Sequence, residues 1–285
     1  MTPPLATWRG TAVGLAATLA LAGCSGVPLA DAGSKASTSA VIADTAGSPS
    51  ATRAPVPARP RVGACYDLDF DQATAPTSEI PPVSCRKRHT TQTYFVGRLD
   101  TVVDGHLLAV DSRVAQRQVS ESCPRHFASY VGGSAGDREL SRLKAVWFSP
   151  TIEESDQGAS WFRCDAVAIE RAGTLAPLPG RVRGILDRPD ALEKVGICGT
   201  AAPGARSFER VICSHRHAWK ALSTISISGT TYPGISAVRR AGEDDCRDQV
   251  ERASGTPERF SYGWEWPTRE QWGDGQHFGY CWAPD

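Results

Sequence analysis

The sequence contains no asparagine, only five lysines and no net charge, because 31 basic residues balance 31 acidic ones. A chain without net positive charge gives no electrostatic case for nucleic acid or an anionic membrane as its main partner. Arginine outnumbers lysine by 26 to 5, a bias typical of GC-rich coding sequences, so we do not interpret it as a binding signal. After the N-terminal segment, no apolar run is long enough to span a membrane. The composition, 41% hydrophobic and 22% charged, is typical of a globular protein.

Familiar catalytic and metal-binding motifs are also missing. The chain has no Gly-x-x-x-x-Gly-Lys phosphate loop, no His-Glu-x-x-His helix and no Cys-x-x-Cys pair. Gly132 to Gly136 have the spacing of a nucleophile elbow, but they follow a predicted helix, whereas that elbow joins a strand to a helix. We therefore expect a glycine-rich loop there. We also expect that the protein is not an enzyme and has neither a cofactor nor a metal site.

Residues 1–23 have the features of an export signal. Arg9 precedes an apolar run of 13 residues, 11–23, which as a helix would span about 20 Å of a bilayer core about 30 Å thick. This length is typical of a signal peptide and too short for a membrane span. The run ends in Leu-Ala-Gly-Cys at residues 21–24, which resembles the bacterial lipobox. We predict that Cys24 is lipidated and becomes the mature N-terminus; the alternative is an ordinary signal peptide that happens to contain a cysteine.

Residues 24–60 are predicted to be the lipidated cysteine and a disordered tether. They are rich in alanine, serine, threonine and proline and have almost no large apolar side chain, so they cannot bury a core. A flexible coil of this length would reach roughly 30–36 Å. The predicted location is the extracytoplasmic face of the cell membrane, with the membrane as a partner through the lipid anchor at Cys24.

The eight remaining cysteines form two sets of four with similar spacing. The gaps are 20, 38 and 41 residues in the first set and 15, 33 and 35 in the second. Neighbouring residues match as well, since Trp, Pro, Thr, Glu and Gly before the fourth cysteine align without a gap. We infer two tandem modules, at 61–170 and 190–285, joined by a linker at 171–189.

The predicted fold class is α+β, with one helix packed on a short antiparallel sheet in each module. Segments rich in β-branched and aromatic residues predict strands after the second cysteine and around the fourth. Apolar residues spaced three to five apart predict helices over about 109–130 and 235–253. The third cysteines, Cys123 and Cys246, lie on the apolar faces of these helices and should point to the core. Cores this small are marginal alone, so covalent staples are expected.

Four cysteines per module in an exported chain predict two disulfides, and three pairings are open. We favour pairing first to second and third to fourth, each closure contributing roughly 3–4 kcal/mol. The resulting pairs are Cys65–Cys85, Cys123–Cys164, Cys198–Cys213 and Cys246–Cys281. The competing interpretation is zinc, because Cys-x-x-x-His ends at His89 and again at His217. The absence of Cys-x-x-Cys and the oxidising location favour disulfides.

Five ring side chains are candidates for partner binding: His89, His215, His217, His277 and Trp272. The repeated His89 and His217 have two interpretations. Each forms a local hydrogen bond that fixes the turn into a strand, or each contacts a partner or senses pH. Trp272 has no aromatic counterpart in the first module, so we expect it to be exposed and to anchor a partner with about 2 kcal/mol. The alternative is packing in the core. Because the unmatched residues concentrate in the second module, we expect that module to carry the main contact surface.

Together these motifs resemble the septum formation family of actinobacterial envelope proteins. The shared features are Gly-x-Cys at each module start, a valine two residues before the second cysteine with a histidine four after it, Tyr-Pro-Gly at 232–234, and a closing Trp, Pro, Gly and Cys. Two features depart from the family: Arg88 and Arg216 precede the histidines, and the first module lacks Tyr-Pro-Gly. The resemblance implies an extracytoplasmic module linked to division, and no catalytic residues.

Three functional hypotheses follow. The first is a non-catalytic envelope lipoprotein that binds another envelope component, protein or polymer, with a link to septum formation. The second is a small-ligand or lipid-binding lipoprotein with a cavity between the modules, which an apolar pocket of several hundred Å³ would favour. The third is a cell-wall hydrolase. The residues repeated in both modules are scaffold types (Cys, Trp, Pro and Gly, with a single His), and this disfavours the third.

Overall fold

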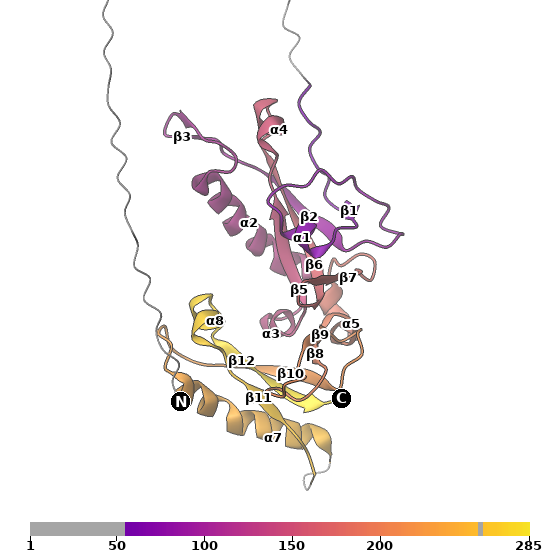
Figure 1. Ribbon diagram of the computed structural model, residues 1–285, viewed down its shortest axis with the longest axis vertical. Coiled ribbons are helices and arrows are strands. Elements are labelled where there is room, and N and C mark those ends of the chain that lie inside the picture. The colour runs from indigo at the N-terminus through magenta and orange to yellow at the C-terminus, as the bar shows by residue number, and fades with distance from the viewer. Residues whose placement is uncertain (1–54, 256–258) are drawn as a thin grey trace, which may run out of the picture. The chain divides into compact units, whose positions relative to one another are not determined.

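The computed structural model describes residues 55–255 and 259–285 (Figure 1). The predicted signal peptide, Cys24 and most of the predicted tether lie outside the described residues. Within those residues, no helix is long and apolar enough to cross a bilayer. The described chain mixes helices with sheets whose strands pair antiparallel, in agreement with the predicted α+β class.

The first sheet has the strand order β1-β2-β6-β5, with β7 beside β6. Its strands are β1 (Cys65–Tyr66), β2 (Thr91–Arg98), β5 (Leu143–Phe148), β6 (Trp161–Arg171) and β7 (Thr174–Ala176). β6 is buried from Trp161 to Ala168 because both faces of the sheet are covered. Strand side chains alternate between faces, so two separate layers of residues pack on this strand.

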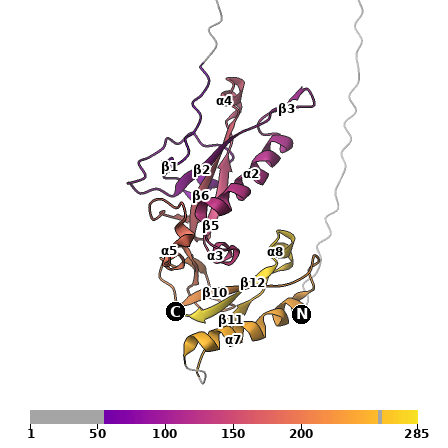
Figure 2. The same cartoon turned by 180° about the vertical axis from the view of Figure 1, so that it is seen from behind.

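The helix α2 (Arg113–Val131) covers one face of the first sheet, while α1 (Phe70–Thr74) packs on the other (Figures 1 and 2). Ser112 caps α2, because its Oγ accepts a hydrogen bond from the backbone N–H of Ala115 at 3.3 Å. The helix therefore begins later than the predicted 109–130. Cys123 is fully buried, as predicted, whereas Val114 points outward.

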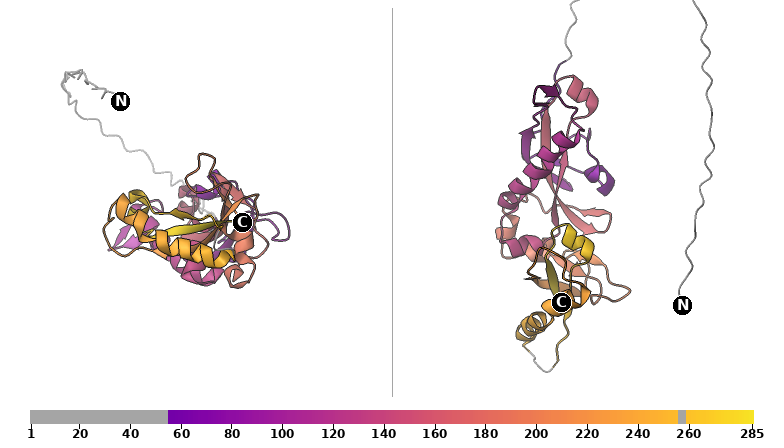
Figure 3. Two further views of the ribbon diagram at one scale, coloured as in Figure 1. Left: turned by 90° about the horizontal axis from the view of Figure 1, so that it is seen from below. Right: turned by 90° about the vertical axis from the view of Figure 1, so that its left-hand side faces the viewer.

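The second sheet has the strand order β11-β12-β10-β8-β9. Its strands are β8 (Ile197–Gly199), β9 (Arg210–Ile212), β10 (Trp219–Ser226), β11 (Gly263–Glu265) and β12 (Phe278–Pro284). The helix α7 (Glu243–Ser254) packs on β11 and β12 (Figure 3). The shorter elements are β3 (Val102–Val103), β4 (His106–Leu107), α3 (Ala135–Glu139), α4 (Ile152–Asp156), η1 (Ile185–Asp187), α5 (Ala191–Val195), α6 (Ile235–Ala241) and α8 (Arg269–Gly273).

The two sheets share strand order and register. The order β1-β2-β6-β5 corresponds to β8-β10-β12-β11. Phe95 lies opposite Cys164 in the first sheet, and Ser223 lies opposite Cys281 in the second. In both sheets the register shifts just before this pair, so one residue bulges out of the ladder, Tyr94 or Leu222.

The helix predicted at 235–253 is two helices, α6 and α7, that break at Gly242. A Cβ at Gly242 would overlap the indole of Trp264, whose Nε1 donates to the backbone O of Val238 at 3.1 Å. The ring therefore occupies the space that a continuous helix with ordinary side chains would fill. Cys246 is fully buried on α7, as predicted.

The segment at 171–189, predicted to be a linker, is part of the folded core. Leu178, Val182 and Ile185 belong to the same cluster of buried residues as the inner face of α2. The halves then join directly, since the backbone N–H of Ile197 donates to the O of Leu140 at 2.9 Å. The described residues of both halves fall in one compact unit.

Four disulfides close these halves, and they are the predicted pairs. Cys65–Cys85 ties the entering strand β1 to the loop before β2, and Cys198–Cys213 ties β8 to the turn after β9. Cys123–Cys164 and Cys246–Cys281 tie each long helix to the central strand beneath it. The helix and the sheet, which are far apart along the chain, are thus held together covalently on both sides of the molecule.

A close approach at Gly97 predicts the effect of a methyl group. The ring of Phe162 lies where a Cβ of residue 97 would be. We expect Gly97→Ala to lower the free energy of unfolding by about 1–3 kcal/mol through overpacking, measured by urea denaturation. The matched control is Gly273→Ala, because its added Cβ would have no heavy atom within 4 Å apart from its chain neighbours and the backbone of its own helix. Equal stability of the two variants would contradict the packing argument.

Candidate functional site

A cavity of about 760 Å³ opens on the face of the first sheet that lies opposite α2. Its walls are residues 58–66, residues 78–83, and side chains from β6 and α4. The disulfide Cys65–Cys85 holds the two wall segments together. The cavity thus has a covalently fixed rim over the buried strand β6.

Three alternate residues of β6 lie on the face of the sheet beneath this cavity and carry polar groups. Trp161 and Arg163 line it, and Asp165 follows on the same face. Arg163 is 2% exposed and Asp165 is fully buried. The Nε of Arg163 lies 3.3 Å from Oδ2 of Asp165, which makes a buried ion pair.

The surroundings of this ion pair are mainly aromatic. The guanidinium of Arg163 lies 3.9 Å from the ring centre of Tyr66 and 4.3 Å from that of Phe148. The Oγ1 of Thr93 donates to Oδ1 of Asp165 at 2.7 Å. Burial raises the pKa of the Asp165 carboxyl, and the charge of Arg163 and the hydrogen bond from Thr93 oppose that rise. Burial likewise raises the pKa of the Tyr66 hydroxyl.

Several polar atoms of the cavity lining have no hydrogen-bond partner in the part of the chain that the structure describes. They are Oγ of Ser78, Nε1 of Trp161 and Nη2 of Arg163, whereas Nε of Arg163 faces Asp165 in the ion pair. Buried polar groups in native proteins are almost always satisfied by protein, water or a ligand. Nitrogens of tryptophan and arginine side chains can only donate. Residues that line the cavity therefore carry buried donors without an acceptor.

The corresponding positions of the second sheet are different. By register, Tyr280 and Trp282 stand where Arg163 and Asp165 stand, and Ala221 stands in the place of Thr93. These three residues form an apolar cluster with Leu140 from the other half. This face therefore carries a buried ion pair beneath a cavity in the first sheet. In the second sheet it carries an apolar cluster that packs against Leu140.

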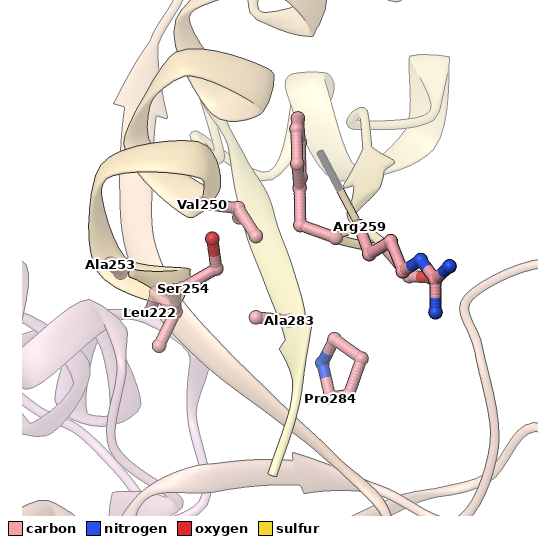
Figure 4. Close-up of a pocket in the computed structure, with 9 residues that line it drawn as sticks. Leu222, Val250, Ala253, Ser254, Arg259, Ala283 and Pro284 are labelled. Atoms are coloured by element: carbon pink, nitrogen blue, oxygen red, sulfur yellow. The ribbon is translucent and has the colours of Figure 1, made fainter. Parts of the chain in front are cut away.

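A second cavity, of about 560 Å³, lies between the end of α7 and the sheet in the second half (Figure 4). It is lined by Leu222, Val250 and Ala253, with Arg259 at its edge (Figure 4). The first half fills the corresponding space with aromatic rings, because Tyr94 packs against Phe127 and Tyr130 at ring-centre distances of 5.7 and 5.4 Å. The cavity exists because small side chains replace three rings.

The expectation that Trp272 is exposed is wrong, because only 4% of the residue is accessible. Trp272 lies on the helix α8, capped by Thr268, whose Oγ1 accepts from the backbone N–H of Gln271 at 3.2 Å. This turn directs the indole inward. There Trp272 stacks on His277 at 4.2 Å between ring centres and meets the edge of Tyr232 at 5.8 Å.

The candidate histidines do not form one surface. His277 lies just before β12, whereas Nε2 of His217 lies 3.0 Å from Oδ2 of Asp285, just after β12. His215 is exposed, with its Nε2 3.9 Å from a carboxylate oxygen of Glu170. His89 is 2% exposed and its Nδ1 donates to the backbone O of Lys87 at 2.8 Å, as the local hydrogen-bond alternative requires. A buried His89 offers no surface to a partner.

The burial of Trp272 changes what its replacement should do. We expect Trp272→Phe to lower the free energy of unfolding by about 1–2 kcal/mol, because part of the buried ring is lost. We expect no effect on capture of a partner by the intact protein. Thermal denaturation followed by circular dichroism tests the first point. An unchanged melting temperature together with weaker capture would restore Trp272 as a surface anchor.

Other motifs from the sequence have structural roles. Ser134, at the centre of the elbow-like sequence, caps α3, and its Oγ donates to Oδ2 of Asp137 at 2.7 Å. Within residues 55–255 and 259–285, no group of three or more His, Cys, Asp or Glu side chains has the arrangement of a metal site. Arg163, Asp165 and Thr93 were not among the candidates from the sequence. Their one signal was the mismatch with the apolar residues at the aligned positions of the second half.

Comparisons with known proteins give one relationship. No curated protein and no solved structure is significantly similar to the chain. The profile of the septum formation family matches residues 62–281 as a single span, which contains the first sheet, most of the second sheet and all four disulfides. This match covers more than half of the chain. The chain therefore belongs to the septum formation family.

Proposed function

We propose that the protein is a non-catalytic envelope lipoprotein that binds another envelope component, protein or polymer, during septum formation. The family supports a role related to cell division. A lipid anchor at Cys24 would hold the described part on the extracytoplasmic face of the membrane. The partner would then be reached from the end of a tether about 36 residues long.

We further propose that the described chain consists of two tandem copies of one module. The equal strand order, the equal register and the two bulges at Tyr94 and Leu222 support a duplication. So do the equivalent capping boxes at Thr151 and Thr268. In this view the conserved geometry is scaffold, and function lies where the copies differ.

The observation that carries the binding proposal is the buried donor set beneath an open cavity in the first half. Arg163 and Asp165 occupy scaffold positions that apolar residues fill in the second half. A buried ion pair is weak evidence for stability, since apolar residues at the same positions are often equally stable. We therefore infer that the pair is retained for recognition, and that the first half carries the contact surface instead of the second.

Crosslinking in living cells tests this proposal. A photoreactive amino acid at Glu79, an exposed residue of the cavity wall, should yield a specific adduct with an envelope component. The matched control is the same amino acid at Glu243, which is exposed at the start of α7 in the second half. An adduct from Glu243 and none from Glu79 would place the contact surface in the second half and contradict the proposal.

The anchor has its own test. We expect Cys24→Ala to abolish labelling with a fatty-acid probe and to leave unprocessed or mislocalised protein, because the thiol is the site of lipid attachment. Immunoblotting of membrane and soluble fractions measures the second effect. Undiminished labelling of the variant would show that Cys24 is not the lipidated residue.

A second function, binding of a small apolar ligand or lipid, is favoured by the cavity in Figure 4, which lies within the second half and not between the modules as expected. Its volume is within the range of small-molecule sites, and its lining is mostly apolar. Leu222→Trp should fill the cavity, because Tyr94 fills the corresponding space in the first half. If the cavity holds a ligand, native mass spectrometry should detect it on the parent protein and not on this variant.

A further inference from the structure

We propose that the cavity over Arg163 binds a carboxylate group carried on an apolar body. This inference rests on the proposed function and names the chemical group that the binding site takes. Nη2 of Arg163, the indole Nε1 of Trp161 and the hydroxyl of Ser78 are the groups that would receive it.

The donors determine the polarity of the ligand. Both Trp161 and Arg163 are more than nine-tenths buried, and the two nitrogens without an acceptor among the described residues, Nε1 of Trp161 and Nη2 of Arg163, can only donate. A buried donor without an acceptor destabilises the folded protein. A group that only accepts hydrogen bonds, and that offers several lone pairs at once, removes this cost at more than one donor. A carboxylate has about four such positions, whereas an amide spends half of its capacity on donation.

The charges around the cavity favour one negative charge over two. Arg59 and Arg61 line it together with Arg163, while Glu79 and Glu154 stand on its walls. Asp165 already lies against the guanidinium from below. Three cations thus face three carboxylates, so a dianion would add repulsion that a monoanion largely avoids. The planar guanidinium also matches a planar carboxylate.

The remaining wall defines the body that carries the carboxylate. Ile80, the neighbouring prolines 81 and 82, and the ring of Trp161 provide apolar and aromatic surface beside the donors. The guanidinium of Arg163 is fixed between the rings of Tyr66 and Phe148, so it does not need to become ordered when a ligand binds. The chemical class is therefore a monocarboxylate attached to an apolar or aromatic group.

The test uses benzoate as the probe and benzamide as its uncharged counterpart. The oxidised full chain is purified from the membrane in detergent, with 5-fluorotryptophan in place of tryptophan. Trp161→Phe identifies the ¹⁹F resonance of residue 161. Benzoate should shift that resonance in a saturable way, and benzamide should bind at least tenfold more weakly. Inorganic phosphate should also bind at least tenfold more weakly than benzoate.

Two variants sharpen the result. Arg163→Met with Asp165→Asn removes both charges of the ion pair, and we expect benzoate affinity to fall at least tenfold while the protein stays folded. Glu79→Gln removes one negative charge from the wall and should strengthen benzoate binding about two- to threefold. Equal shifts with benzoate and benzamide, or tighter binding of phosphate, would overturn the carboxylate assignment. So would unchanged benzoate affinity in the folded double variant.

This outcome is separable from that of the proposed function. If an envelope component crosslinks at Glu79 but benzoate does not bind, only the chemical class is wrong. If benzoate binds but no envelope component crosslinks at Glu79 in cells, the carboxylate assignment is supported. The proposal that the protein binds an envelope component is then contradicted.

Discussion

Replacement of Arg163 by methionine should lower the free energy of unfolding by about 3–5 kcal/mol. The change removes the cation of a pair in which Arg163 is 2% exposed and Asp165 is not exposed at all. A carboxylate left in that position has lost both water and its counter-charge, and neutral donors such as the hydroxyl of Thr93 remain. Urea denaturation at neutral pH measures the loss.

The same variant should lose less stability in acid than at neutral pH. Burial already raises the pKa of Asp165, and removal of Arg163 takes away the main influence that lowers it. The folded state then keeps a proton that the unfolded chain releases above about pH 4. Between the pKa of Asp165 in the unfolded chain and its higher pKa in the folded variant, the folded state binds more protons. The free energy of unfolding of the variant therefore falls as pH rises through this range. The deficit of the variant relative to the parent protein should therefore be larger at pH 7 than at pH 4.

A double variant separates the loss of the charge pair from the loss of packing. In Arg163→Met with Asp165→Asn the buried charge is absent, and the amide oxygen can still accept from Thr93. We expect this protein to lie within about 1–2 kcal/mol of the parent, since neutral replacements of buried ion pairs are often tolerated. It should also lack the extra dependence on pH. A double variant as unstable as the single one would show that the aliphatic part of Arg163, packed between two rings, is what stabilises the fold.

Cysteine spacing and strand composition predicted much of the scaffold from the sequence. The pairing of Cys123 with Cys164 followed from a helix whose apolar face carries one sulfur and a strand that carries the other. That inference needs only local periodicity and an oxidising compartment. The strand order and the bulges needed more, because they depend on contacts between segments far apart in the chain.

The errors came from positions where tertiary packing overrides local pattern. Trp272 lies in a polar stretch, which predicts exposure, but a single capped turn of helix directs its indole onto His277. Residues 171–189 are rich in proline and glycine, yet their few aliphatic side chains fill a gap beside α2. The sequence pattern places Gly242 inside one helix. In the structure the helix breaks there, and the ring of Trp264 occupies the space that a Cβ of residue 242 would need.

The candidate site was missed for a related reason. Arg163 and Asp165 alternate with Phe162 and Cys164, a pattern that in an antiparallel strand usually means one buried face and one exposed face. Here the polar face is also covered, by a segment that carries no helix or strand pattern and is held by Cys65–Cys85. Sequence periodicity describes a strand and does not reveal what an irregular segment covers.

Loss of the disulfide between α2 and β6 should lower the free energy of unfolding by about 4 kcal/mol. Cys123 and Cys164 are separated by 41 residues, and for a loop of that length the restriction of the unfolded chain corresponds to about 3.9 kcal/mol. Both sulfurs are fully buried, so Cys123→Ala with Cys164→Ala also removes core volume. Urea denaturation of the oxidised parent and of the double variant measures the difference.

The disulfide of Cys198 with Cys213 is the matched control, because it closes only 15 residues. The same relation gives about 3 kcal/mol for that loop, so its removal should destabilise the protein less than removal of Cys123–Cys164. A larger loss at the shorter loop would mean that native packing around the sulfurs, and not loop length, determines the contribution. The ordering matters for the candidate site. Cys164 lies between Arg163 and Asp165 on β6, so the covalent link to α2 fixes the strand that presents the ion pair to the cavity.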